Sequence, residues 1–219
     1  SPYASDHLHL LHTQHGTTFH MERSVRSAKH IGDRIELTLS DGCAFETDVL
    51  LSGIGSEPNM DLAVQAGLLC ANGIVVNSEC RTSDPGIYAI GDVACLQGAE
   101  KVNPPTRLES WENAELQAVR AACSIYAAMG HAAPALEPLQ APWFWTDQYD
   151  LNLQIVGFPS AGDHMVVRHK AGQAQKSIAF HLRDGVVCAA ELFNSGRERK
   201  AVRQLIAQGE PLDPALLAN

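Results

Sequence analysis

The sequence predicts an α/β fold with a parallel sheet and an antiparallel meander, followed by a C-terminal α+β module. Three observations carry this prediction. Short alternating apolar segments lie in the first quarter of the chain, after a helix pattern. A continuous apolar run and an alanine-rich helix pattern occupy the middle, and further alternating segments precede a terminal helix pattern. With 219 residues, 45% of them hydrophobic, the chain can bury a core and divide into more than one domain.

The N-terminal part is predicted to be a helix that leads into the meander. Apolar residues recur at helical spacing over residues 4–15, and Gly16 stops this pattern before an extended run at residues 17–20. Two segments separated by a Gly-Asp turn follow at residues 24–31 and 34–39, and apolar residues alternate in the second. These segments are expected to pair as antiparallel strands.

The middle of the chain is predicted to supply the parallel strands. Residues 49–54 form a continuous apolar run, which is typical of a strand buried on both faces of a parallel sheet. A loop, a short helix and two more strands are expected after it, at residues 55–59, 60–66, 73–76 and 86–90.

The longest helix is predicted to begin after Ser110, a favourable N-cap, with Glu112 in its first turn and Gly130 at its end. Its apolar face is expected to hold Ala114, Ala118, Ala121, Ala122, Ile125 and Met129. Residues 132–141 contain two prolines and four alanines, which predicts a linker and a domain boundary.

Four strands and a helix are predicted beyond the linker. Asp184 and Gly185 indicate a hairpin, and Ser195 with Glu198 has the spacing of a capping box for a helix that Gly209 ends. The four strands are expected at residues 153–156, 165–169, 177–182 and 186–193.

Composition limits the partners of the protein. The 25 acidic residues outnumber the 16 basic ones, and the net charge of -9 argues against nucleic acid as a partner. The densest basic cluster, at residues 197–203, is favoured as a solvated helix face. No apolar run reaches the roughly 18 residues of a membrane span and no charged leader is present, so a soluble, cytoplasmic protein without a membrane partner is expected.

Cysteine and histidine patterns do not predict a metal site. The six cysteines never form a C-x-x-C pair, so neither a zinc knuckle nor a local redox disulfide is expected. His7, His9, His12 and His15 are favoured as histidines on an exposed helix face. A hydrolytic triad of Ser110, Asp92 and His131 is rejected, because Ser110 is the expected helix cap and no nucleophile elbow surrounds it.

Gly91 and Asp92 are the first candidate site residues. They end the run TSDPGIYAIGD at residues 82–92, in which a turn feeds a short predicted strand. A carboxylate at the end of such a strand can accept hydrogen bonds from a polyol, and Gly91 allows a ligand to approach closely. The alternative is that Asp92 only caps its own turn.

Residues 82–92 resemble the second FAD signature of flavoproteins with two dinucleotide-binding domains, and this resemblance implies that Asp92 binds the flavin ribityl chain. DVLLSGIGSEPN at residues 48–59 resembles the segment that returns from the NAD domain to the FAD domain. Two further segments are similar to ferredoxin reductases that serve aromatic-ring dioxygenases and cytochrome P450 systems: RLESWENAELQA at residues 107–118 and PWFWTDQYDLNLQIVG at residues 142–157.

The same resemblance places Trp111 and Trp145 at the isoalloxazine ring. An indole covers a conjugated ring at low entropy cost, which agrees with that role. For Trp143, an inter-domain core position is favoured. No catalytic acid or base is expected in this chain, because the flavin supplies the chemistry.

The resemblance also implies the division of the chain and the activity of the intact enzyme. Residues 1–55 would be the C-terminal part of an NAD(P)-binding domain, residues 56–138 that of an FAD-binding domain, and residues 139–219 a C-terminal reductase domain. The intact enzyme would pass electrons from NADH or NADPH through FAD to a [2Fe-2S] ferredoxin. The helix at residues 197–203, with Arg107, would offer this ferredoxin a basic docking surface.

A complete member of this family would be about twice as long. Neither phosphate-binding G-x-G-x-x-G turn is present in the sequence, so this chain alone is expected to bind FAD weakly or not at all and to be inactive. Two alternative functions stay open: a cofactor-free interaction or dimerisation module, and a related NADH oxidase or rubredoxin reductase. Assembly as a homo-oligomer also stays open.

Overall fold

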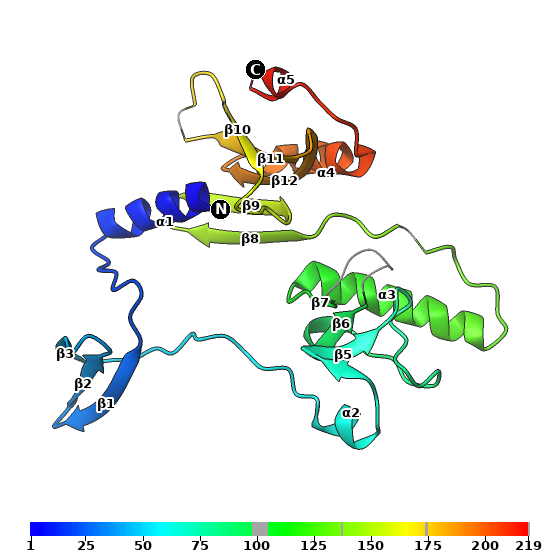
Figure 1. Cartoon of the computed structure of the whole chain (residues 1–219), viewed down its shortest axis with the longest axis horizontal. Helices are drawn as coiled ribbons and strands as arrows, with labels where there is room; N and C mark the ends of the chain where they lie inside the picture. The colour runs from blue at the N-terminus through cyan, green and yellow to red at the C-terminus, as the bar shows by residue number, and fades with distance from the viewer. Residues whose placement is uncertain (98–104, 137, 174, 219) are drawn as a thin grey trace. The chain divides into compact units, whose positions relative to one another are not determined.

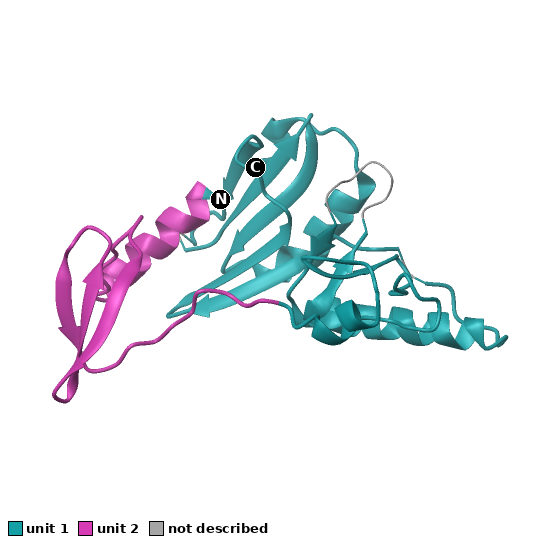
Figure 2. Ribbon diagram, turned by 60° about the horizontal axis from the view of Figure 1, so that its bottom comes forward, with its two compact units in different colours: residues 1, 58–219 teal, residues 2–57 magenta. Residues whose placement is uncertain are grey.

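The computed structural model describes residues 1–97, 105–136, 138–173 and 175–218. They form two compact units, residues 2–57 and residues 58–219 together with Ser1 (Figure 2). Figure 1 shows the order of the elements along the chain. Helices are combined with three sheets, two of them antiparallel and one mixed, so the predicted α/β class with an added α+β module is confirmed.

The unit of residues 2–57 holds the predicted helix and meander. Helix α1 (Pro2–Gln14) ends before Gly16, which has the left-handed φ of +88° that favours glycine. Three antiparallel strands follow in chain order, β1 (Val25–Ile31), β2 (Arg34–Leu39) and β3 (Ala44–Thr47). Residues 17–20 form no strand, contrary to the predicted extended run.

The predicted strand at residues 49–54 is wrong. These residues form no strand, and Leu51 and Ile54 are 89% and 95% exposed. A strand that is buried on both faces needs a neighbour on each side for its backbone hydrogen bonds. None of the described strands pairs with this run, so its apolar pattern alone does not order it.

A small mixed sheet lies within residues 58–138. Helix α2 (Asp61–Gln65) precedes it, and its strands are β4 (Cys70–Ala71), β5 (Gly73–Val76), β6 (Ala94–Leu96) and β7 (Thr106–Arg107). Only β5 and β6 pair in parallel among the described residues. The strand predicted at residues 86–90 is absent and is replaced by a single bridge between Arg81 and Tyr88.

Helix α3 (Trp111–Ala128) begins after Ser110, whose side chain accepts a hydrogen bond from the Asn113 amide at 3.2 Å, as predicted. Its predicted apolar face is wrong, because Ile125 and Met129 are exposed. Of the predicted face only Ala121 is buried, and the other buried positions of α3 are Gln117 and Ser124. Both polar side chains are hydrogen-bonded, Gln117 Oε1 to the Gly91 amide at 2.7 Å and Ser124 Oγ to Arg81 at 3.3 Å, which removes the usual cost of burying them.

The C-terminal part is a five-stranded antiparallel sheet in the order β10-β11-β12-β9-β8. Residues 132–136 and 138–141 of the predicted linker contain neither helix nor strand, and residue 137 lies outside the described residues. The four predicted strands are confirmed, and a fifth, β8, contains the aromatic segment. Their bounds are β8 (Trp143–Gln148), β9 (Leu151–Gly157), β10 (His164–His169), β11 (Ser177–Arg183) and β12 (Val186–Phe193).

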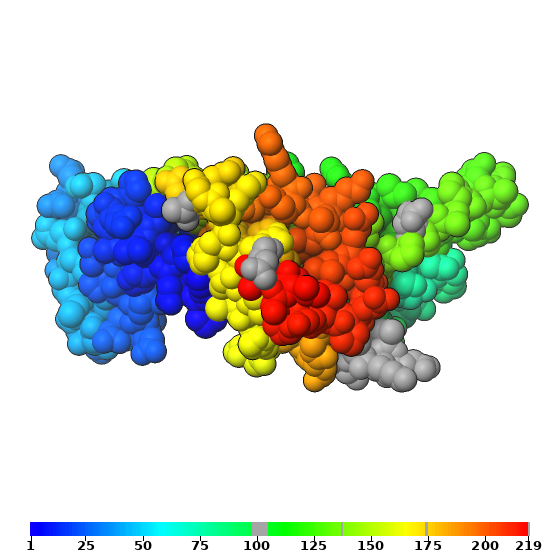
Figure 3. All heavy atoms as spheres, turned by 90° about the horizontal axis from the view of Figure 1, so that it is seen from above, coloured from blue at the N-terminus to red at the C-terminus, as the bar shows by residue number. Residues whose placement is uncertain are grey.

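Two helices pack on this sheet. Helix α4 (Arg199–Gln208) supplies Val202 and the short helix α5 (Pro214–Leu217) supplies Leu217 to a core with Phe180 and Leu192. In Figure 3, α5 lies beside β10 on the surface shown. The predicted capping box is wrong: the side chain of Ser195 makes no cap, because a 3-10 turn (Gly196–Glu198) precedes α4.

We expect the substitution Gly157→Ala to lower the free energy of unfolding by about 2–3 kcal/mol. Gly157 has φ +77°, and a Cβ there would lie 2.3 Å from the Cys188 carbonyl oxygen. Chemical denaturation measures the loss. The control is Gly162→Ala, because a Cβ at Gly162 meets nothing within 4 Å. Equal stability of the two variants would contradict this account of the β9–β12 contact.

Candidate functional site

Two indoles meet at a cleft between the start of α3 and strand β8. The rings of Trp111 and Trp145 are 6.2 Å apart and inclined at 79°, an edge-to-face pair. Glu109, Ser110 and Phe144 complete the lining of a cleft of about 240 Å³. Trp111 is 78% exposed and Trp145 is 42% exposed, so a large aromatic surface stays open to a ligand.

Local structure explains why both rings reach the cleft. Ser110 caps α3, which fixes Trp111 as the first residue of that helix. Trp143 and Trp145 share a face of β8, because side chains two residues apart in a strand point to the same side. Their rings stack at 4.5 Å with planes 21° apart, and Trp143 Nε1 donates to Gln154 Oε1 at 3.0 Å. Trp143, which is held by Gln154, therefore packs against the Trp145 ring and restricts its position.

Gly91 and Asp92 lie in a 3-10 turn (Gly91–Val93) that contacts α3. Gly91 has φ +72°, and a Cβ there would meet only Ala114 at 3.8 Å. The backbone conformation, and not crowding, therefore requires glycine. The Asp92 side chain is exposed, while its carbonyl accepts a hydrogen bond from Arg107 at 3.1 Å. Asp92 lies two residues before β6, which begins at Ala94, so it does not end a strand as predicted.

These residues fit part of a flavin. The indole cleft suits a flat conjugated ring, and the exposed Asp92 carboxylate can accept hydrogen bonds from a polyol. A cleft of about 240 Å³ is smaller than the roughly 300–1,000 Å³ of a site that encloses a whole ligand. The described residues could therefore cover a flat ring and bind a polyol, and the cleft lining includes no cradle for phosphates.

The cysteines do not form a reactive thiol pair. All six are free, and Cys80 and Cys95 are buried. Burial raises the pKa of the Cys80 and Cys95 thiols, and burial together with Asp163 raises the pKa of Cys188. Reactive cysteines need the opposite shift, because the thiolate is the nucleophile.

Other candidate groups are not brought together into a site. Among the described residues, no group of three or more His, Cys, Asp or Glu side chains could hold a metal ion. His7 and His9 are exposed on α1 and His15 is exposed just beyond its end, as favoured from the sequence, whereas His12 on α1 is half-buried. In the described parts of the chain, no helix combines the length and the apolar character that a membrane crossing requires.

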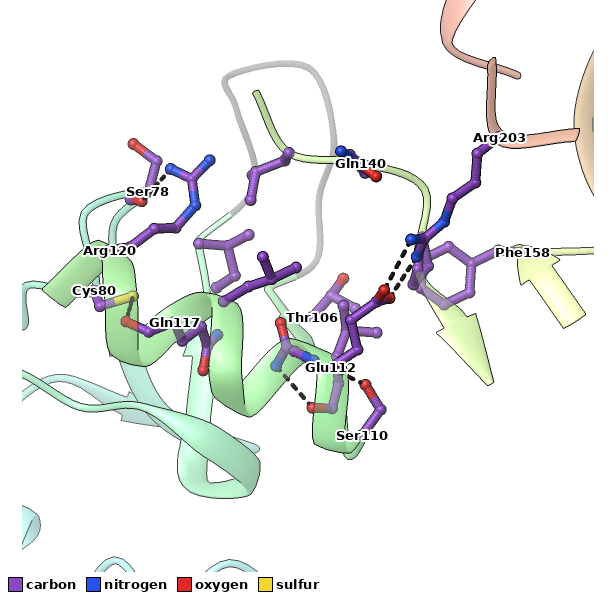
Figure 4. A pocket seen from close by; sticks show the side chains of 16 residues that line it. Ser78, Cys80, Thr106, Ser110, Glu112, Gln117, Arg120, Gln140, Phe158 and Arg203 are labelled. Carbon is purple, nitrogen blue, oxygen red and sulfur yellow. Dashed lines mark hydrogen bonds and ion pairs between the residues drawn. The ribbon is translucent and has the colours of Figure 1, made fainter. Parts of the chain in front are cut away.

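Two arginines of α4 were missed as neighbours of the cleft. The Arg199 guanidinium lies 3.8 Å from the centre of the Trp143 ring, and Arg203 binds Glu112. The sequence showed only a basic helix, because contacts between residues 91 positions apart leave no periodic signal. A second cavity of about 230 Å³ lies beside the Arg203–Glu112 pair (Figure 4).

Comparison with known families gives two matches. Residues 1–118 match the family model described as pyridine nucleotide-disulphide oxidoreductase, and residues 143–219 match the model described as reductase C-terminal. The second match contains Trp143 and Trp145, and the first contains Asp92 and Trp111.

Solved structures show the same relationship. A ferredoxin reductase for the CYP199A2 system of Rhodopseudomonas palustris is 30% identical, with a TM-score of 0.85 over 100% of this chain and 52% of its own. Putidaredoxin reductase, in a covalent complex with putidaredoxin, is 32% identical with a TM-score of 0.87 over 100% of this chain and 51% of its own. This chain therefore spans about half the length of these structures. An NAD-dependent persulfide reductase of A. fulgidus, 19% identical with a TM-score of 0.74, shares the fold.

Proposed function

The chain belongs to the pyridine nucleotide-disulphide oxidoreductase family, and we propose that it is the C-terminal half of a flavoprotein ferredoxin reductase. When bound, FAD would supply hydride acceptance from NADH or NADPH and release of single electrons to an iron-sulfur ferredoxin. The two similar solved structures are reductases of this kind. We keep the division into residues 1–55, 56–138 and 139–219 as part of the proposal.

The observation that carries this proposal is the edge-to-face pair of Trp111 and Trp145. Two largely exposed indoles at one cleft provide flat surface and exclude water on one side of a ring. Asp92 accepts hydrogen bonds from the ribityl hydroxyls, and Gly91 keeps the turn that presents it. We assign no catalytic acid, base or metal to this chain. Its residues orient the cofactor and shield it.

We expect the isolated chain to bind FAD weakly or not at all. The described site covers a ring but offers no phosphate cradle, which would supply much of the binding free energy. The chain is purified without added flavin, incubated with FAD and then dialysed against flavin-free buffer, and its absorbance at flavin wavelengths is measured after purification and after dialysis. A colourless protein is the expected result. A stoichiometric yellow complex that survives dialysis would contradict it.

The structure changes which basic residues can meet an acidic ferredoxin. Arg199 stacks on Trp143, Arg203 binds Glu112, and Arg107 is only 11% exposed beside Glu109. These three side chains therefore bind partners within the chain. Arg199 and Arg203 differ in this from the solvated face favoured from the sequence, and Arg107 differs from the expected docking surface. Arg197 and Lys200 remain exposed.

We expect the double charge reversal Arg197→Glu with Lys200→Glu, made in the complete reductase, to raise the KM for ferredoxin about 3- to 10-fold and to flatten its salt dependence. Steady-state ferredoxin reduction at several salt concentrations measures both effects. The control is Lys29→Glu, a reversal at another exposed position, on β1. If the double variant and the control have the same KM for ferredoxin and the same salt dependence, the hypothesis that ferredoxin docks on this helix is wrong.

A second candidate function is a cofactor-free interaction module. The exposed run of residues 49–54 favours it, because apolar side chains that stay exposed are common at protein interfaces. An NADH oxidase or rubredoxin reductase is a variant of the first proposal with another acceptor. Flavin content and NADH oxidation of the complete protein separate the enzyme from the module, and the rates with ferredoxin, rubredoxin and oxygen separate the acceptors.

A further inference from the structure

We propose that Arg203 is a positioning residue for the tryptophan cleft, which it reaches through Glu112 and the carbonyl of Ala141. The arginine does not line the cleft itself. It would set the relative placement of Trp111 and Trp145, and so the surface presented to the flavin. The link to the flavin rests on the proposed function, whereas the control of the tryptophan pair does not.

The guanidinium of Arg203 makes a forked contact. Nη1 donates to Glu112 Oε1 at 2.8 Å, and Nη2 donates to Glu112 Oε2 (Figure 4). Nη2 also donates to the Ala141 carbonyl at 2.9 Å. The side chains of Arg203 and Glu112 are 16% and 24% exposed. A planar, bidentate pair that is largely shielded from water is more directional than an exposed ion pair.

The two groups that Arg203 binds lie next to the elements that carry the two indoles. Glu112 directly follows Trp111 in the first turn of α3, and Ala141 lies just before strand β8, which carries Trp145. One guanidinium therefore holds both elements that bring the rings to the cleft. If it were lost, the start of α3 and the start of β8 would no longer share a common partner.

Arg199 completes the arrangement one helical turn earlier. Its guanidinium lies over Trp143 at 3.8 Å, and Trp143 stacks on Trp145, which in turn meets Trp111. The contacts thus form a closed circuit, from α4 through the three tryptophans to Glu112 and back to α4. Closed circuits restrict relative motion more than single contacts do, because each contact limits the freedom of the others.

The test uses the tryptophans as reporters. The sequence has three tryptophans, and all of them belong to this circuit. Near-UV circular dichroism and tryptophan emission of this 219-residue chain therefore report on the cleft without any flavin. The variants are Arg203→Met, Arg203→Lys, Glu112→Gln and the double variant Glu112→Gln with Arg203→Met. The control is Lys200→Met, an exposed charge on the same helix.

We expect Arg203→Met and Glu112→Gln each to reduce the near-UV tryptophan signal to about half or less, and the double variant to add nothing, because both remove one coupled contact. Arg203→Lys keeps the charge but not the fork, so it should restore the signal only in part. Lys200→Met should match the unchanged chain. Far-UV circular dichroism confirms folding, and if Arg203→Met does not fold, Arg203→Lys and Glu112→Gln decide by the same criterion.

Folded variants at Arg203 and Glu112 with an unchanged tryptophan signal would overturn the positioning role, whatever their thermal stability. The same variants in the complete reductase separate this proposal from the proposed function. A shifted flavin absorption spectrum together with a changed tryptophan signal supports both. A changed tryptophan signal with an unperturbed flavin spectrum supports the role of Arg203 but contradicts a flavin at the cleft.

Discussion

Replacing Trp145 by alanine in the complete reductase is expected to lower the rate of ferredoxin reduction by about 100-fold, the effect of losing the placement of a reacting group. Trp145 joins the stack with Trp143 to the edge contact with Trp111, so its loss opens one side of the cleft. Stopped-flow measurement of flavin reduction and reoxidation shows which half-reaction is slowed.

Two comparisons make this result specific. Trp145→Phe keeps a flat ring and should recover most of the rate. Tyr149→Ala removes an aromatic side chain that is 56% exposed and lies outside the cleft, so it should leave the rate unchanged. If Trp145→Ala reduces ferredoxin as fast as Tyr149→Ala does, the proposed role of Trp145 at the flavin is wrong.

In the 219-residue chain with a free amino group at Ser1, replacing Glu191 by glutamine is expected to lower the free energy of unfolding by about 3–5 kcal/mol at neutral pH, because it breaks a buried ion pair. The Glu191 side chain is fully buried on β12, with the Ser1 ammonium at 3.0 Å and His181 Nε2 at 3.4 Å. The loss is measured by chemical denaturation. The control is Glu46→Gln, because the Glu46 pair with Arg34 is about half exposed and should contribute at most about 1 kcal/mol.

The Glu191 carboxylate is also expected to make the stability of the chain sensitive to acid. Burial would raise the pKa of Glu191, but His181 and Ser1 lower it to about 2, from 4.5. A depressed pKa means that the stabilisation is complete above the unfolded value of 4.5 and is lost as the pH falls towards 2. The unchanged chain should therefore lose stability between pH 5 and 3 more steeply than Glu191→Gln. Parallel pH curves for the two proteins would exclude this role.

Local patterns predicted most of the fold, because they need only neighbours in sequence. The N-cap at Ser110, the Asp184-Gly185 hairpin and the stop at Gly209 follow from backbone preferences that act within a few residues. The alternating segments of the C-terminal sheet were found for the same reason. Strand β8 was missed because its aromatic residues gave no alternation to count.

The failures occurred where partners distant in sequence decide the structure. Residues 49–54 and 86–90 have the composition of buried strands, yet no described strand pairs with them as a ladder. Gln117 is buried because it binds the Gly91 amide, which no hydropathy pattern shows. The contact of Arg203 with Glu112 is likewise invisible before folding.

The sequence pointed to the two indoles of the cleft but not to the residues that support them. Asp92, Trp111 and Trp145 were found through the resemblance of their segments to a known family, and Trp111 and Trp145 do meet in the structure. The arginines behind them were assigned instead to a solvated face or a docking surface. Only the folded chain shows that α4 holds the tryptophan strand and the start of α3.

Tryptophan emission during FAD binding tests the central claim most directly. FAD is titrated into the flavin-free complete reductase, and the emission of a Trp111→Phe with Trp145→Phe variant is subtracted to isolate the two cleft indoles. If these rings cover the flavin, binding should quench most of the isolated emission, because stacked or edge-on contact places them against the conjugated ring. Stoichiometric FAD binding that leaves this emission unchanged would contradict a flavin at the Trp111–Trp145 cleft.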